Sequence, residues 1–410
     1  MSSSSPRVVI VGAGHAGGTA AALLRQYGFS GAISLVGEEP IPPYQRPPLS
    51  KAWLKGEADA DSLALKPLEF YGENGIDFRA GTRAVSLDRV GKSVALSDGS
   101  TLGYDALILA TGARAIKLPI PGADLAGVVE LRTAADAEVL KAALQPGVRV
   151  AVVGGGYIGL EAAASARALG AAVVVLEREG RILARVACET LSTFFQNYHE
   201  AKGVAFELGA SAVEFAGRDG KVTGVTLADG RTIPCDLILV GVGAAPNDEL
   251  AKAAGLDCNR GVVVNLEART SDPAIFAIGD VAQRPMPIYE HRMFRMESVP
   301  NALEQAKQAA SAICGRPAPL GETPWQWSDQ YDLKLQIAGY PFDADRILVR
   351  GDPALGKFAI FHLKGDLVQA VEAINSPPEF MMGKQLIGNR KPVSISRLAD
   401  TTVSMKEVAA

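Results

Sequence analysis

Hydrophobic positions along the chain form one pattern that occurs twice. Short apolar runs rich in β-branched residues, at 7–11 and 149–153, are each followed by a glycine-rich turn. An alanine- and leucine-rich stretch comes next, at 18–24 in the first copy and at 160–169 in the second. Runs of this length predict buried strands, and the stretches after the glycines predict helices.

Each predicted helix leads into a second apolar run that ends at an acidic residue. These runs lie at 32–36 and 172–176, and the acids are Glu38 and Glu177. Strands that alternate with helices in this way predict a parallel sheet with helices packed on its faces. The order strand, turn, helix, strand and acid therefore predicts two Rossmann-like units in one chain.

The glycines of the first turn suit a dinucleotide. Gly12 makes the turn, Gly14 lets the backbone approach a pyrophosphate, and Gly17 lets the helix pack against the strand. Glu38 follows at about 20 residues, where an acid accepts hydrogen bonds from a ribose diol. The corresponding residues of the second copy are Gly154, Gly156, Gly159 and Glu177. One such motif is weak evidence, but two complete units predict two dinucleotides, namely a bound flavin and an exchanging nicotinamide.

Turn residues and further apolar runs divide the chain into three predicted domains of an α/β protein. Prolines near 119–122 and at 245–246 delimit an inserted segment. Beyond it, strands at 346–349 and 358–363 and a helix at 378–387 predict an α+β carboxy-terminal domain. The predicted limits are 1–113 with 246–322 for a discontinuous FAD-binding domain, 114–245 for the NAD-binding domain, and 323–410 for the carboxy-terminal domain.

Composition restricts the partners and the location. The chain is 48% hydrophobic and 21% charged with a formal net charge of -4, which argues against a general nucleic-acid binder. No apolar run approaches the roughly 20 residues that span a bilayer, so no membrane association is expected. The polar opening, residues 1–6, lacks the character of a secretory signal and is predicted to be a disordered tail. We expect a cytoplasmic protein.

Cysteines and histidines are scattered. The cysteines stand at 188, 235, 258 and 314 and the histidines at 15, 199, 291 and 362. The absence of a CxxC pair excludes a redox-active dithiol of the kind that disulfide reductases need, and it excludes an iron–sulfur cluster held by this chain. No metal site is predicted.

Several segments resemble a family of flavoproteins over the whole length of the chain. An apolar strand ends in Ala110-Thr-Gly112, and a Gly279-Asp motif follows at 275–282, as in two-dinucleotide-binding-domain flavoproteins of the glutathione reductase type. The resemblance narrows to the NADH–ferredoxin reductases of cytochrome P450 and dioxygenase systems, of the putidaredoxin reductase kind. It is carried by residues 46–51 (RPPLSK), 154–161 (GGGYIGLE), 297–302 (ESVPNA) and 325–331 (WQWSDQY).

This resemblance implies cofactor sites residue by residue. It places FAD at Gly12, Gly14, Ala16, Gly17, Glu38, Lys51, Ala84, Thr111, Gly112, Arg132, Asp280, Val299 and Trp327. It places the nicotinamide dinucleotide at Gly154, Gly156, Ile158, Gly159, Glu177 and Gly243. FAD is expected to be bound tightly without a covalent link. Glu177 favours NADH over NADPH because a carboxylate repels a 2′-phosphate, although the adjacent Arg178 could pair with one.

The resemblance also implies the reaction. A hydride passes from NADH to flavin N5, and two single-electron transfers then reduce a [2Fe–2S] ferredoxin that serves an oxygenase. Lys51, Glu161 and Trp327 are the catalytic candidates beside the flavin. Basic residues at Lys66, Lys307 and Arg316 are the candidates for docking an acidic ferredoxin. A structural ion pair and packed aromatic residues are the alternative interpretations of the catalytic candidates.

Two other functions fit the same scaffold. An NADH oxidase, a peroxidase or a disulfide reductase would need a cysteine beside the flavin, where this chain has Lys51. A flavoprotein of the apoptosis-inducing-factor kind, whose redox state regulates binding, would turn over slowly and keep a stable complex after NADH addition.

Overall fold

The computed structural model describes residues 5–409, and its contacts divide the chain into two compact units. The first unit comprises residues 1–45, 60–114 and 245–326, and the second comprises 46–59, 115–244 and 327–410. Of the predicted tail at 1–6, residues 1–4 lie outside the described residues. The predicted domain limits stay a prediction.

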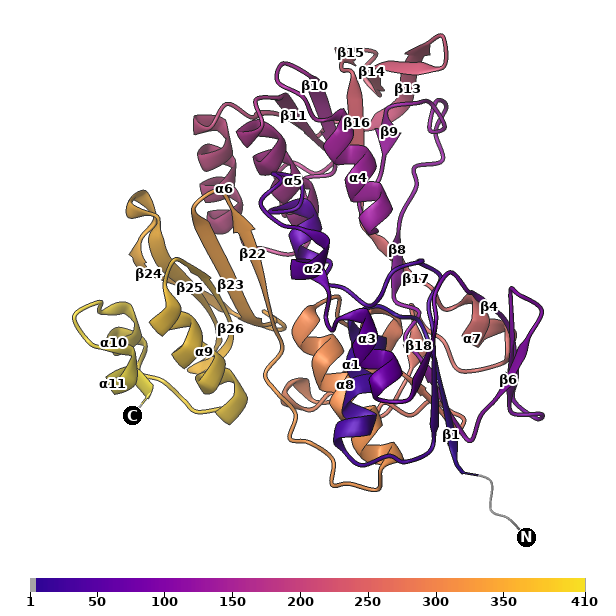
Figure 1. Ribbon diagram of the computed structural model, residues 1–410. Helices are drawn as coiled ribbons and strands as arrows, with labels where there is room; N and C mark the ends of the chain where they lie inside the picture. Colours follow the sequence, from indigo (N-terminus) through magenta and orange to yellow (C-terminus); the bar gives the residue numbers. More distant parts are fainter. Residues whose placement is uncertain (1–4, 410) are drawn as a thin grey trace. The chain divides into compact units, whose positions relative to one another are not determined.

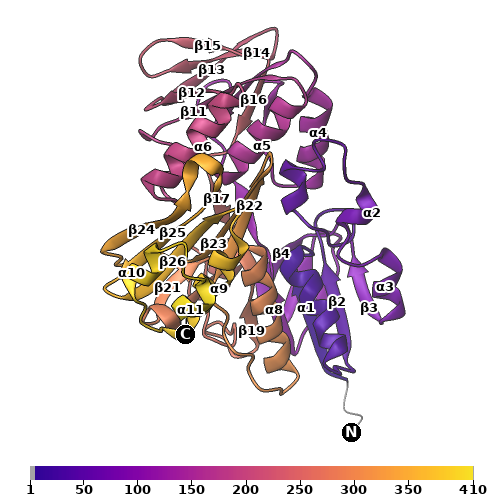
Figure 2. The same cartoon turned by 90° about the vertical axis from the view of Figure 1, so that its left-hand side faces the viewer.

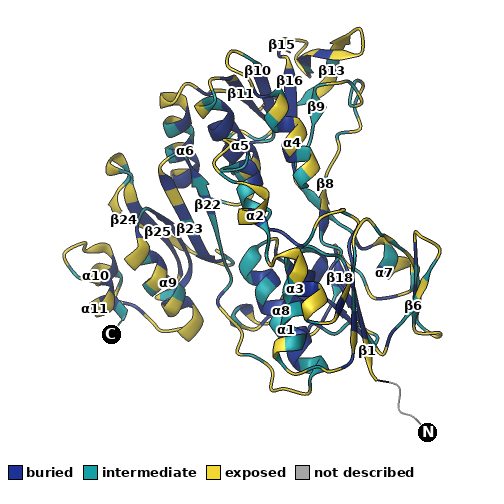
Figure 3. Ribbon diagram, in the orientation of Figure 1, coloured by how far each residue is buried: buried dark blue, intermediate teal, exposed yellow. Residues whose placement is uncertain are grey.

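The first unit is built on a parallel sheet covered by helices. Its strands, in the order β19-β7-β1-β2-β3, are Ile275–Ala277, Ala106–Leu109, Arg7–Val11, Ala32–Val36 and Ile76–Arg79. Neighbouring strands pair in parallel, with Arg7 opposite Ala32 and Val8 opposite Ala106. Strands β1 and β2 cover the predicted ranges 7–11 and 32–36. Their β-branched residues are buried on both faces, as expected for a parallel sheet. Figure 3 shows the burial of each element along the ribbon.

Helices α1 (His15–Gln26) and α8 (Val299–Ile313) lie side by side against this sheet (Figure 1). Small residues line their contact, and Ala20, Ala306 and Ala309 are fully buried. Small side chains let the two backbones approach closely. The Ser298 hydroxyl caps α8 by accepting a hydrogen bond from the backbone N–H of Asn301.

Smaller elements complete the first unit. Its other helices are α2 (Ala60–Leu63), α3 (Leu68–Glu73) and α7 (Glu249–Ala253). One three-stranded sheet contains β4 (Ala84–Asp88), β5 (Ser93–Leu96) and β6 (Thr101–Gly103), and another contains β18 (Val262–Val263), β20 (Ala282–Met286) and β21 (Arg292–Arg295). The chain passes between the units within β8 (Ala113–Ala115) and β17 (Ala244–Pro246).

The second unit repeats the parallel-sheet architecture. Its sheet has the order β12-β11-β10-β16-β9, with strands Ala205–Leu208, Ala172–Glu177, Arg149–Val153, Leu237–Val240 and Val128–Val129. The accompanying helices are α4 (Ala134–Ala143), α5 (Tyr157–Ala168) and α6 (Glu189–Ala201). A three-stranded sheet of β13 (Ala212–Arg218), β14 (Lys221–Leu227) and β15 (Thr232–Pro234) is added. Both helices that follow glycine turns begin earlier than predicted, because the turn leads directly into the first helical residues.

An antiparallel sheet near the carboxyl terminus also belongs mainly to the second unit. Its order β22-β23-β26-β25-β24 comprises Trp325–Gln330, Leu333–Gly339, Leu367–Ile374, Lys357–Lys364 and Arg346–Asp352. Helix α9 (Pro377–Asn389) packs on β23 and β26, and α10 (Ile395–Ala399) and α11 (Met405–Ala409) follow (Figure 2). The predicted α/β class, with two Rossmann-like domains and a carboxy-terminal α+β domain, is confirmed.

Candidate functional site

The carboxyl ends of four strands bring most of the FAD candidates to one edge of the first sheet. β1 leads into Gly12 and β2 into Glu38, while β7 leads into Thr111 and β19 into Asp280. Because these strands are parallel, the residues after them meet at the same edge. In open α/β sheets, ligands bind outside this edge, so these FAD candidates lie together where a dinucleotide could bind.

The first glycine turn leaves open space where a pyrophosphate would lie. Gly12 has φ +110°, and a Cβ there would lie 2.1 Å from the carbonyl oxygen of Ala110. Gly14 caps α1 with ordinary backbone angles, and a Cβ on it would meet nothing within 4 Å. The turn therefore has packed glycines on its protein side and an open glycine at the helix N-terminus, which fits FAD.

The Gly-Asp motif lies next to this turn. A Cβ on Gly279 would lie 3.0 Å from the Cβ of Ala16. The Gly279 N–H donates to Gln305 Oε1 at 2.8 Å, and Arg295 donates to the Asp280 carbonyl at 3.0 Å. Two residues far apart in the sequence, Ala16 and Asp280, are thereby held at one end of α1.

The remaining FAD candidates of the first unit lie on or near the same elements. The Glu38 side chain is 71% exposed and lies 3.7 Å from Arg83. Thr111 donates to the carbonyl of Asn247 at 2.7 Å, so its hydroxyl stabilises the crossing of two chain segments. Gly112 has φ +65°. Gly17 is buried in α1, Ala84 begins the outer strand β4, and Val299 is the first residue of α8.

The second turn reproduces the geometry of the first. Gly154 has φ +113°, and a Cβ there would lie 2.4 Å from the carbonyl oxygen of Gly241. Gly156 caps α5, and a Cβ on it would meet nothing within 4 Å. Ile158, in the first turn of α5, is 48% exposed, whereas Gly159 is buried against the turn. This edge of the second sheet fits a second dinucleotide.

Glu177 supports the second turn with both oxygens of its carboxylate. Oε2 accepts from the Gly155 N–H at 2.8 Å, and Oε1 accepts from the Glu179 N–H at 2.9 Å. Arg178 turns away and pairs with Glu179 at 3.0 Å, with 72% of its side chain exposed. Gly243 follows β16 at the same edge, with φ +124°.

Lys51 and Glu161 form a mostly buried ion pair in the second unit. Lys51 Nζ lies 2.6 Å from Glu161 Oε2, and the two side chains are 17% and 5% exposed. Lys51 follows a short 3-10 helix (Pro47–Ser50), and Glu161 lies on α5. The sequence therefore names two catalytic candidates that are in direct contact.

Two serine hydroxyls complete the environment of the Glu161 carboxylate. Ser50 donates to Oε2 at 2.5 Å, and Ser328 on β22 donates to Oε1 at 2.6 Å. Three donors on one carboxylate fix its orientation. Sequence reasoning did not single out these serines, although both lie inside the segments that carry the family resemblance, at 46–51 and 325–331.

Arg132 and Trp327 are the other two candidates of the second unit that the resemblance places at the flavin. Arg132 donates its backbone N–H to Asp136 at 3.1 Å, just before α4, and its carbonyl accepts from Arg46. Trp327 is partly buried on β22. Because neighbouring strand residues point to opposite faces, Trp327 points away from the side on which Ser328 contacts Glu161.

A chain of hydrogen bonds continues from Ser328 to a buried histidine. Gln330 donates to Ser328 Oγ at 3.1 Å, and its Oε1 lies 2.7 Å from His199 Nε2. Both side chains are at most 1% exposed. Burial lowers the pKa of His199 below its ordinary 6.5, since a charged imidazole is poorly solvated there. His199 therefore acts as a neutral donor towards Gln330.

Replacement of His199 by glutamine should flatten the acid side of the stability profile. Below pH 6.5 the unfolded chain binds a proton at His199 that the folded chain does not, so wild-type stability falls with pH. Urea unfolding at pH 7.5 and 5.5 should show a larger loss for wild type than for His199→Gln. The exposed His291 offers a control, since His291→Gln should keep the wild-type slope. Equal losses in all three proteins would contradict the assignment.

The basic docking candidates all belong to the first unit. Lys66 is exposed, with Nζ 5.3 Å from the centre of the Phe70 ring. Lys307 Nζ lies 3.6 Å from Glu322, and the Arg316 guanidinium lies 4.4 Å from the ring centre of Tyr27. Among residues 5–409, no helix is long and apolar enough to cross a bilayer.

Comparison with known proteins gives the same assignment over almost the whole chain. The family model described as pyridine nucleotide-disulphide oxidoreductase matches residues 6–306, and the model described as reductase C-terminal matches 325–409. The chain belongs to the pyridine nucleotide-disulphide oxidoreductases. It is therefore an oxidoreductase, and the family implies FAD and a nicotinamide dinucleotide. The turns at Gly14 and Gly156 fit these two groups.

Individual relatives cover nearly the full length. The chain is 53% identical to a protein of Castellaniella defragrans named probable ferredoxin reductase, over 98% of each chain. It is 42% identical to putidaredoxin reductase of Pseudomonas putida, over 98% of this chain and 96% of the relative. Among solved structures, the covalent putidaredoxin reductase–putidaredoxin complex matches with a TM-score of 0.96 at 42% identity, covering 99% of this chain and 98% of the other. The resemblance to ferredoxin reductases is confirmed.

Proposed function

We propose that this protein is an NADH-dependent ferredoxin reductase that supplies electrons to an oxygenase system. The observation that carries the proposal is its 42–53% identity, over 98% of its length, to proteins named as reductases of ferredoxins or putidaredoxin. The chemistry would come from FAD, which when bound would supply hydride acceptance from NADH and one-electron transfer to a [2Fe–2S] protein.

The residues of the chain bind and orient the two dinucleotides. The N-termini of α1 and α5 present backbone N–H groups to the two pyrophosphates, beside the open positions Gly14 and Gly156. Lys51, held by Glu161, would supply a positive charge to bound flavin, and Trp327 would pack against its ring. Ser50 and Ser328 fix the orientation of the Glu161 carboxylate so that the Lys51 ammonium stays in one position.

NADH is proposed as the reductant on the evidence of charges around Glu177. Its carboxylate lies at the end of β11, where a ribose diol can donate to it and a 2′-phosphate is repelled. Arg178, which could have received a phosphate, is paired with Glu179 instead. Glu177 and Glu179, on either side of Arg178, therefore both disfavour NADPH.

Glu177→Ala should shift the nicotinamide preference towards NADPH. The ratio of kcat/KM for NADH to that for NADPH is expected to fall at least about tenfold, or ~1.4 kcal/mol, because repulsion of the phosphate is removed. Since Glu177 also accepts two backbone N–H groups, kcat/KM for NADH itself should fall. Arg178→Ala is the control and should keep the NADH preference. An unchanged ratio in Glu177→Ala would refute the role of this carboxylate.

The proposed partner is a small acidic [2Fe–2S] ferredoxin. The net charge of the chain is -4, so docking would depend on local basic groups. Lys66, Lys307 and Arg316 are the proposed contacts. A docking role for them implies that the rate of ferredoxin reduction falls with rising salt more steeply in wild type than in a variant that lacks these charges.

Steady-state electron transfer tests the proposed function. Purified flavoprotein should reduce cytochrome c with NADH rapidly when a [2Fe–2S] ferredoxin is present and slowly without it. An NADH oxidase would consume oxygen at the same rate in either case. A redox-regulated binding protein would instead form a long-lived complex after NADH addition, with little turnover.

A further inference from the structure

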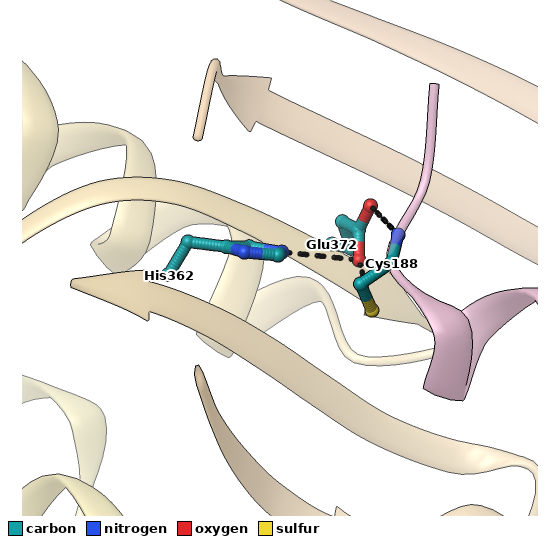
Figure 4. Close-up of side chains that lie close together, drawn as sticks. All are labelled: Cys188, His362 and Glu372. Carbon is teal, nitrogen blue, oxygen red and sulfur yellow. Dashed lines mark hydrogen bonds and ion pairs between the residues drawn. The ribbon is translucent and has the colours of Figure 1, made fainter. Parts of the chain in front are cut away.

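A cysteine, a histidine and a glutamate lie together in the second unit (Figure 4). Cys188 caps the N-terminus of α6, His362 lies on β25 and Glu372 lies on β26. The sequence predicts no metal site because its cysteines and histidines are scattered, and Cys188 is far along the chain from the hairpin that carries His362 and Glu372. Only the fold brings them together.

The three side chains converge on one carboxylate oxygen. Cys188 Sγ lies 3.1 Å and His362 Nε2 lies 3.2 Å from Glu372 Oε2. All three candidate ligand atoms lie within 4.8 Å of one another. In the antiparallel pair, His362 is opposite Ala370 and Glu372 is opposite Ile360, so the histidine and the glutamate are diagonal neighbours on one face. Small shifts would place one cation at normal bonding distance from all three atoms.

Burial and charge both favour a cation at this position. His362 and Glu372 are 4% and 3% exposed. In the part of the chain that the structure describes, no lysine or arginine pairs with Glu372, and its only ion-pair contact is His362. A buried carboxylate without a fixed positive partner is costly. A divalent cation with one thiolate, one carboxylate and a neutral imidazole gives a site with no net charge.

We propose that Cys188, His362 and Glu372 bind a divalent transition metal of the Zn²⁺ type. Thiolate and imidazole ligands select Zn²⁺ over Mg²⁺ or Ca²⁺, which take oxygen ligands. Binding replaces the hydrogen of the Cys188 thiol by a metal–sulfur bond and releases one proton to solvent. Three protein ligands leave a fourth tetrahedral position for water. The metal would fasten the start of α6 to the strands β25 and β26.

Zinc binding to the intact flavoprotein tests the site. Protein prepared without a polyhistidine tag should retain one Zn²⁺ per chain after gel filtration, measured by atomic emission. Cys188→Ser and Glu372→Gln should each weaken binding at least about tenfold. Cys258→Ser, which changes another half-buried thiol, should bind like wild type. FAD content monitors the folding of every variant.

X-ray absorption at the zinc edge of the wild-type protein gives a readout that is independent of folding of the variants. The expected spectrum has one sulfur at about 2.3 Å together with nitrogen and oxygen ligands. A protein that binds no Zn²⁺, a spectrum without sulfur, or equal binding by wild type, Cys188→Ser and Glu372→Gln would each overturn the proposal.

Discussion

Gly156→Ala is expected to lower kcat/KM for NADH at least about tenfold, equivalent to ~1.4 kcal/mol, while FAD stays bound. The alanine methyl group would meet no protein atom within 4 Å, so the fold itself accommodates it. Its backbone angles, φ −82° and ψ 178°, suit any residue, and loss of a glycine N-cap costs less than about 1 kcal/mol. A large kinetic effect would therefore come from the pyrophosphate, which the methyl group would keep away from the backbone. Stopped-flow reduction by NADH measures it.

Gly14→Ala is the matched variant in the other turn. Gly14 has the same helix-capping position and the same open surroundings, so its substitution should weaken FAD retention instead. FAD released on dialysis and the kinetics of the FAD-reconstituted variant distinguish the two sites. Loss of FAD from Gly156→Ala, or loss of NADH affinity alone from Gly14→Ala, would reverse the assignment of the two turns. Gly72→Ala, at an open helical glycine, should change neither property.

Lys51→Met is expected to cost about 3 kcal/mol of folding free energy, because it leaves the Glu161 carboxylate buried without its cation. The Ser50 and Ser328 hydroxyls still donate to the carboxylate, so we expect the cost to lie at the low end for a broken buried ion pair. Glu161→Gln should cost less, since Lys51 is 17% exposed and also donates to the Pro47 carbonyl. Urea unfolding of the holoprotein measures these differences.

The double variant separates a charge effect from a packing effect. If the stranded carboxylate causes the loss, Lys51→Met with Glu161→Gln should be more stable than Lys51→Met alone, by at least about 1 kcal/mol. Equal stability of these two proteins would count against the ion pair. The rate of flavin reduction by NADH should also fall at least about tenfold in Lys51→Met. A normal rate together with lowered stability would make the pair structural only.

Much of the fold follows from local sequence pattern. The runs at 7–11, 32–36 and 149–153 predict strands β1, β2 and β10 because β-branched residues without polar interruptions must be buried on both faces. The glycine turns and the acids Glu38 and Glu177 could also be placed from the sequence, because residues that come directly after parallel strands meet at one edge of the sheet. The cofactor residues assigned by resemblance remain predictions, although most of them lie at these edges.

Other features depend on long-range contacts that no local pattern records. Ser50 and Ser328 contact the same carboxylate from distant segments, and a serine in a loop or strand has no distinctive spacing. The Cys188, His362 and Glu372 cluster depends on the register of β25 and β26 and on the start of α6. The segment 46–59 groups with the second unit, although the predicted FAD-binding domain includes it.

An anaerobic titration tests whether this protein passes electrons from NADH to a ferredoxin. A catalytic amount of the FAD-loaded protein is mixed with excess oxidised [2Fe–2S] ferredoxin. NADH is then added in measured portions while the visible spectrum of the iron–sulfur centre is followed. Two ferredoxins should be reduced for each NADH consumed. Oxidation of NADH without reduction of ferredoxin, or no oxidation of NADH at all, would contradict the proposed function.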